Sequence, residues 1–120
     1  MDDLQDFQGT WQAVWLAEDG RKRTAAEAAT TRLTIAGDGY TLRLGEVVSH
    51  GVIASIDPTS SHGAVDFVPE GREGSGGRSL GIYALGDDEL AVCVAAPGQG
   101  RPTSFAPRRG GGHSLYLLKR

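Results

Sequence analysis

Apolar and polar residues alternate with a period of two in several short stretches of the chain. The alternation is clearest over residues 32–36 and 40–44, on either side of Gly37-Asp38-Gly39. A second pair of strand-forming runs, residues 80–85 and 89–94, flanks Gly86-Asp87-Asp88. Period-two alternation gives a strand one apolar face, and short Gly/Asp turns between two such runs are typical of β-hairpins. The pattern therefore predicts two antiparallel hairpins.

Four further runs rich in strand-forming residues cover 11–17, 47–56, 64–68 and 114–119. Within the second of these, Gly51 predicts a bulge or a sharp bend, because glycine in a strand interior commonly marks one.

One window, residues 24–31, favours a helix: Thr24 is the expected N-cap, and Glu27 stands at the capping-box position. The segment from Ala95 to Gly112 is rich in Pro and Gly and is expected to be mostly loop, with residues 103–105 as its one chance of extended structure.

About eight short strands with one helical insertion predict an all-β barrel or sandwich, in a single domain over residues 1–120.

Composition and charge narrow the classes of partner. The chain has 120 residues, a net charge of −3 and a single cysteine, Cys93, so it can form no intrachain disulfide and no cysteine-based zinc site. It lacks the clustered basic residues typical of nucleic-acid-binding proteins and any apolar run long enough to span a membrane. We therefore expect a cytoplasmic protein that binds neither nucleic acid nor membrane.

The charges are distributed unevenly between the two ends. Residues 1–20 contain five acidic and no basic residues, whereas residues 101–120 contain five basic and no acidic ones. In a closed meander the first and last strands pair, so we expect these two ends to lie side by side and to attract each other.

Few residues point to catalysis or to metal binding. The three histidines, His50, His62 and His113, show no spacing that would place two metal ligands on one element, so we expect neither a metal nor a cofactor. Cys93 lies between two valines and is interpreted as a small buried residue. Asp66, between Val65 and Phe67, is a candidate general acid or base only if its side chain points inward with a raised pKa.

Gly9-Thr10-Trp11 resembles the Gly-x-Trp signature of the calycin superfamily, the lipocalins and their relatives. The resemblance implies a small, eight-stranded, antiparallel up-and-down barrel in which Trp11 packs across the closed end and a basic residue, Arg120, lies over it. The chain also resembles a bacterial family of small lipocalin-like domains of uncharacterised function. The matching stretches are Leu4 to Trp11, Arg32 to Tyr40, Gly51 to Pro58, Val65-Asp66, Leu80 to Phe105, and Leu117 to Arg120.

This resemblance implies an interior that holds a small apolar or amphipathic ligand. By alternation, Trp11, Ala13 and Trp15 share one face of the first strand. The residues expected to line a pocket are Trp15, Tyr40, Leu42, Tyr83, Phe105 and Tyr116.

Two alternatives remain open beside ligand binding. One is a cofactor-independent cyclase or isomerase of the natural-product type, which would use the barrel as a shaped pocket. The other is a filled barrel that acts as a protein-interaction domain. Ala54 and Ala91 stand where the bacterial family usually has polar residues, so a second apolar surface and a monomer or a homodimer are both compatible with the sequence.

Overall fold

The computed structural model describes residues 3–58, 63–70, 78–105 and 112–120. Consecutive strands pair antiparallel around the sheet, and β1 closes the circle by pairing with β9. Eight strands form this closed barrel, while β2 is a two-residue addition to β1, so the predicted all-β, eight-stranded barrel is confirmed. The elements are α1 (Asp3–Asp6), β1 (Gly9–Glu18), β2 (Arg21–Lys22), α2 (Ala25–Ala29), β3 (Thr31–Ala36), β4 (Gly39–Leu44), β5 (Val47–Asp57), β6 (Gly63–Pro69), β7 (Ser79–Leu85), β8 (Glu89–Ala95) and β9 (His113–Lys119).

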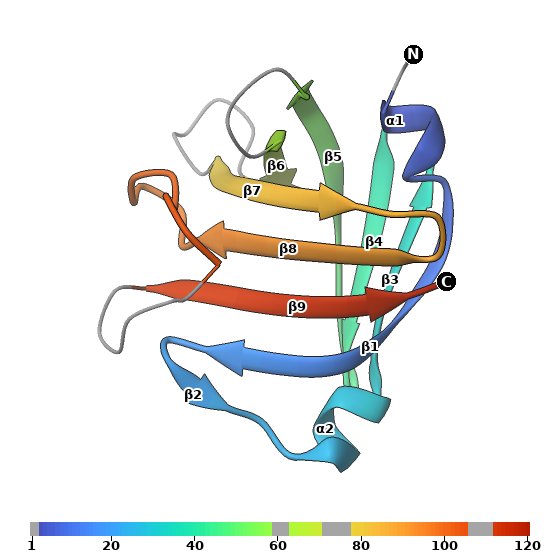
Figure 1. Ribbon diagram of the computed structural model, residues 1–120, viewed down its shortest axis with the longest axis vertical. Helices are drawn as coiled ribbons and strands as arrows, with labels where there is room; N and C mark the ends of the chain where they lie inside the picture. Colours follow the sequence, from blue (N-terminus) through green and yellow to red (C-terminus); the bar gives the residue numbers. More distant parts are fainter. Residues whose placement is uncertain (1–2, 59–62, 71–77, 106–111) are drawn as a thin grey trace.

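The barrel is flattened into two layers whose strands cross at a steep angle. In Figure 1, β3, β4 and β5 run nearly perpendicular to β7, β8 and β9, and β1 curves from the first layer into the second. Orthogonal layers of this kind are joined at corners by strands that bend or bulge as they change layer. Here β1 and β5 are those strands, since each pairs with one layer along its first half and with the other along its second half.

The corner in β1 changes which side chains face the interior. The register with β9 shifts between Ala13 and Trp15, so Val14 bulges outward and is 54% exposed. Trp11 and Ala13 belong to the interior core, whereas Trp15 packs against a separate cluster that contains Cys93. The prediction that Trp15 shares a face with Trp11 is therefore wrong, because the extra residue inverts the alternation.

The corner in β5 lies three residues beyond its predicted position. Gly51 stays in register and pairs with Tyr40 on one side and Pro69 on the other. The register shift falls instead between Ile53 and Ser55, around Ala54. Gly51 therefore lies in regularly paired strand and does not form the bulge that was predicted there.

The predicted helix forms with its expected cap. The Thr24 hydroxyl accepts a hydrogen bond from the Glu27 backbone N–H, and the Glu27 carboxylate accepts one from the Thr24 backbone N–H. This capping box starts α2, whose residue Ala28 is buried against the barrel. The Gln12 side-chain amide donates to the carbonyl oxygens of Ala28 and Ala29, which ties the helix to β1. No helix in the described part of the chain is long and apolar enough to cross a membrane.

One end of the barrel is filled around Trp11. The indole is fully buried, and its N–H donates to the Phe7 carbonyl oxygen at 2.8 Å. The Arg120 guanidinium lies 4.3 Å from the centre of the Trp11 ring and donates hydrogen bonds to the carbonyl oxygens of Asp6 and Gln8. Gly9 has a φ of +119°, a conformation that only glycine adopts without strain. We call this the Trp11 end.

The first and last strands pair as predicted, but in the described part of the chain the opposite charges of the two ends form no ion pair with each other. Among the described residues, Lys119 pairs with Glu89, and Arg120 lies 3.9 Å from the Asp88 carboxylate. Glu18, on β1, pairs with Arg23 on the segment before α2. Backbone hydrogen bonds between β1 and β9, rather than ion pairs between the two ends, therefore hold the closure together in this part of the chain.

Candidate functional site

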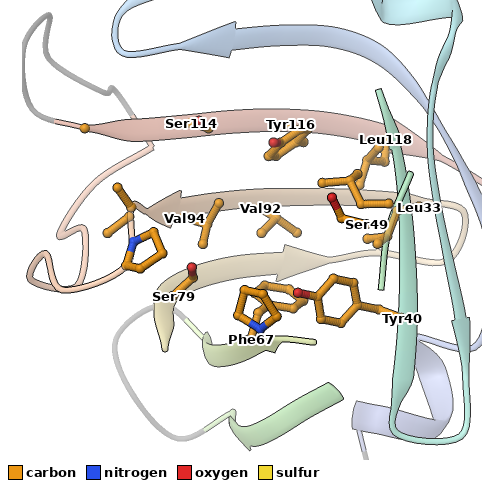
Figure 2. Close-up of a pocket in the computed structure, with 16 residues that line it drawn as sticks. Leu33, Tyr40, Ser49, Phe67, Ser79, Val92, Val94, Ser114, Tyr116 and Leu118 are labelled. Carbon is orange, nitrogen blue, oxygen red and sulfur yellow. The ribbon is translucent and has the colours of Figure 1, made fainter. Parts of the chain in front are cut away.

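A cavity of about 290 Å³ lies between the two layers, toward the end of the barrel opposite the Trp11 end (Figure 2). At this end β4, β6 and β8 finish and β5, β7 and β9 begin. Of the sixteen described residues that line it, eleven are apolar, and the other five carry hydroxyl groups. The apolar ones are Leu33, Leu42, Phe67, Pro69, Val92, Val94, Ala95, Ala96, Pro97, Gly112 and Leu118, and the hydroxyl-bearing ones are Tyr40, Ser49, Ser79, Ser114 and Tyr116.

Strand alternation explains why these side chains meet. On β9, every second residue from Ser114 through Tyr116 to Leu118 faces the cavity, and on β8 Val92 and Val94 do so. In Figure 2 these two rows form one wall, with the Tyr40 ring from β4 on the other side of the space. None of the described lining side chains is charged, so this part of the lining is apolar with uncharged hydrogen-bonding groups.

Tyr40 is held in place from two sides. Its ring meets Phe67 edge to face, with the centroids 5.2 Å apart. On its other side the ring lies over Gly51, where a Cβ atom would come within 2.6 Å of the ring and 2.4 Å of the Val68 carbonyl oxygen. Gly51 therefore gives the Tyr40 ring room to lie flat against β5. Burial raises the pKa of the Tyr40 phenol, which keeps it protonated.

Tyr116 supplies the second phenol. Burial, with a smaller contribution from the Glu18 carboxylate, raises its pKa to about 12, and a hydrogen bond with the Ser114 side chain acts in the opposite direction. Tyr40 also contributes to the raised pKa, so the two phenols are close enough to influence each other. Both groups are consequently neutral hydrogen-bond donors at neutral pH.

Of the predicted ligand-binding residues, the structure brings Tyr40, Leu42 and Tyr116 together in the cavity wall. Tyr83 is also inside the barrel, but it lies nearer the Trp11 end, where its ring contacts Phe7 edge to face at 4.8 Å between centroids. It does not line the cavity.

Trp15 and Phe105 lie on the outer surface of the β7–β9 layer. Both pack on a small cluster formed by Ile82, Cys93 and Leu115. Cys93 is fully buried there, and burial raises the pKa of its thiol. The structure thus separates these two aromatic residues from the cavity.

Asp66 also faces away from the cavity. Its neighbours Val65 and Phe67 point into the core, so its own carboxylate projects from the opposite face of β6. There it forms ion pairs with Arg101 at 2.7 Å and with Arg78 at 3.2 Å. The inward orientation that general acid or base catalysis would require is absent.

The Arg101 side chain fastens a loop over the outer face of the barrel. Besides its ion pair with Asp66, it donates to the Gly81 carbonyl oxygen at 2.8 Å. The same segment supplies Ala96 and Pro97 to the cavity wall. The Asp66 carboxylate therefore helps to position one side of the cavity from outside it.

Several lining residues were not singled out from the sequence, among them Ser114 and Val94. Ser114 could have been found, since it has the same parity on its strand as Tyr116. The sequence pattern predicts only that Phe67, Val92 and Val94 are core residues, because nothing in a sequence distinguishes a side chain that fills a barrel from one that lines a cavity in it.

The histidines and acidic residues form no metal site in the described part of the chain. No three His, Cys, Asp or Glu side chains converge there. His50 is exposed and lies within hydrogen-bonding distance of the Thr41 hydroxyl, at 3.1 Å, while His62 lies outside the described residues.

Comparison of the chain with models of protein families, with curated proteins and with solved structures finds no match. The likeness to calycins is therefore carried by the architecture: a closed, antiparallel, eight-stranded barrel is compatible with a calycin-like fold.

Proposed function

We propose that the protein binds a small, largely apolar molecule inside its barrel. The observation that carries this proposal is the 290 Å³ cavity, whose described lining is uncharged and mostly apolar. Pockets for small molecules usually begin at about 300 Å³ and combine apolar walls with a few polar groups that orient the ligand. The cavity matches that description at its small end, so the ligand is expected to be compact.

The resemblance to lipocalins and to small bacterial lipocalin-like domains supports the same function. Arg120 lies over Trp11, which is the contact that this resemblance implies. It lies at the filled end of the barrel, away from the cavity, and leaves the other end for a ligand. The cytoplasmic location and the choice between monomer and homodimer stay predictions.

Ligand binding is favoured over the two alternatives. A filled barrel that serves only as an interaction domain has no use for a space between its layers. A cyclase or isomerase would use the same cavity, but its described lining contains no side chain that titrates near neutral pH, and Asp66 points elsewhere.

Native mass spectrometry of the purified protein would reveal a ligand that co-purifies with it. Tryptophan fluorescence is a poor reporter of occupancy, because Trp15 lies outside the barrel and Trp11 is sealed at the opposite end. An uncharged fluorescent probe, N-phenyl-naphthylamine, is the better choice, since its emission rises when it enters an apolar site.

Two variants add the same bulk at different places. Val94→Phe places a ring in the cavity, and Val14→Phe places one on the exposed outer bulge. We expect Val94→Phe to weaken probe binding about tenfold, or about 1.4 kcal/mol, and Val14→Phe to leave it unchanged. Equal probe affinity in both variants and the wild type, or no binding to any of them, would contradict the proposed function.

A further inference from the structure

We propose that the cavity selects uncharged ligands that carry a carbonyl oxygen, which the hydroxyl groups of Tyr40 and Tyr116 bind. The inference rests on the proposed function and makes the two tyrosines specificity-determining residues. It excludes carboxylates, such as fatty acid anions, as preferred ligands.

The absence of charge on the described lining carries the first step. A carboxylate that enters an apolar cavity loses its hydration, and this costs several kcal/mol unless a cation or several donors replace the water. Among the described lining residues there is no Lys, Arg or His to do so. The charged group that raises the pKa of Tyr116 is the Glu18 carboxylate, which offers an anion no attraction, and the Arg23 guanidinium near it is already paired with Glu18.

The positions of the two phenols carry the second step. Tyr40 comes from β4 and Tyr116 from β9, and Figure 2 shows the two side chains lining the cavity from different walls. The Tyr40 hydroxyl makes no hydrogen bond with any residue of the described chain. A phenol is a better donor than acceptor, so its natural partner in an apolar site is an acceptor oxygen on the ligand.

The rigid support of Tyr40 carries the third step. Phe67 and Gly51 fix its ring from two sides, so its hydroxyl is already oriented before a ligand arrives. A donor that is ordered in advance adds affinity without an entropic cost on binding. This favours a directed hydrogen bond over a site that recognises shape alone.

A matched series of competitors for N-phenyl-naphthylamine tests the inference. Ethylnaphthalene, acetonaphthone and naphthoate share one ring system and carry an apolar group, a ketone and a carboxylate at the same carbon. At pH 7 we expect acetonaphthone to bind about 2- to 12-fold more tightly than ethylnaphthalene, which corresponds to one net hydrogen bond of about 0.5–1.5 kcal/mol. Naphthoate should bind at least tenfold more weakly than ethylnaphthalene.

Tyrosine-to-phenylalanine variants assign the preference to residues. Tyr40→Phe and Tyr116→Phe should each reduce the preference for the ketone while leaving the affinity for ethylnaphthalene unchanged. Tyr83→Phe is the matched control, because that ring lies in the barrel but does not line the cavity. It should keep the wild-type preference. Thermal unfolding of each variant identifies any that fails to fold, and the remaining tyrosine variant then supplies the test.

The outcomes separate the two proposals. If ethylnaphthalene displaces the probe but the ketone binds no better, or naphthoate binds best, the inference is overturned and ligand binding stands. The inference is also overturned if both tyrosine variants retain the preference. If the probe and all three competitors fail to bind the wild type, ligand binding itself is refuted.

Discussion

Gly51 is the residue at which one added methyl group would most directly test the construction of the cavity. In Gly51→Ala, the new Cβ would lie 2.4 Å from the Val68 carbonyl oxygen and 2.6 Å from the Tyr40 ring. Contacts this short are not tolerated, so something must move. The Val68 carbonyl belongs to the backbone of β6, whereas the Tyr40 ring has the cavity beside it. We therefore expect the ring to shift into the cavity, while the β5 and β6 backbones separate slightly to relieve the contact with the Val68 carbonyl oxygen.

Two opposing terms set the change in stability. Overpacking of a core costs about 1–3 kcal/mol. Replacing a strand glycine with alanine recovers about 0.5–1 kcal/mol of backbone entropy. At the midpoints of these two ranges, the net loss in the free energy of unfolding is about 1 kcal/mol, which corresponds to a fall in Tm of about 4 °C. Because the displaced ring occupies part of a space of only 290 Å³, the affinity for N-phenyl-naphthylamine should also be lower than in the wild type.

Two other glycines provide controls for the same assay. In Gly63→Ala the new Cβ would lie 2.4 Å from the Tyr83 ring, so stability should fall, but that ring does not line the cavity and probe affinity should persist. In Gly39→Ala the nearest atom is the Ala36 carbonyl oxygen at 3.5 Å, and both quantities should stay near wild type. Unaltered probe affinity in a folded Gly51→Ala protein would refute this account of the cavity. An equal loss of probe affinity in Gly51→Ala and Gly63→Ala would refute it as well.

Two further predictions concern residues outside the cavity. Arg120→Lys keeps a positive charge near Trp11 but loses the guanidinium fork, whose Nη1 donates to the carbonyl oxygens of Asp6 and Gln8 and whose Nη2 donates to that of Asp87. Urea unfolding should therefore show a loss of about 1 kcal/mol for Arg120→Lys and about 2 kcal/mol for Arg120→Ala, with probe affinity unchanged in both. Equal stability of all three proteins would contradict the closing role of Arg120. Cys93 is fully buried and burial raises its thiol pKa, so iodoacetamide should modify it only in urea-unfolded protein; rapid modification of the native protein would show that the outer cluster is open.

Local patterns in the sequence were sufficient to predict the strands and their order. Alternation over residues 32–44 and turn residues at Gly86-Asp87-Asp88 act through neighbours along the chain, and both hairpins form as predicted. The capping box at Thr24 and Glu27 is equally local. Closure of the barrel follows once each strand pairs with the next, because the last strand then returns to the first.

Features that depend on side-chain contacts between different elements were not predictable in the same way. Gly51 has no local signal for its role, since the Tyr40 ring that occupies its side-chain space comes from another strand. The sequence left open which way Asp66 points, and the two arginine partners that hold its carboxylate outside the barrel come from separate loops. The prediction that Tyr40, Leu42 and Tyr116 line a pocket used only their side-chain type and their alternation along each strand. These residues line the cavity because the faces of β4 and β9 that carry them point inward.

The bulge at Val14 connects the errors in the sequence-based prediction to the proposed function. With uninterrupted alternation on β1, the Trp15 indole would face the interior beside the strand that carries Tyr116, and the largest side chain available would occupy the space between the layers. One extra residue turns Trp15 outward onto the Cys93 cluster and places the smaller Leu16 inside, opposite Tyr116. The same bulge lets β1 change layers and leave β3 for β9. The corner at which β1 changes layers therefore also keeps a bulky side chain out of the space between the layers.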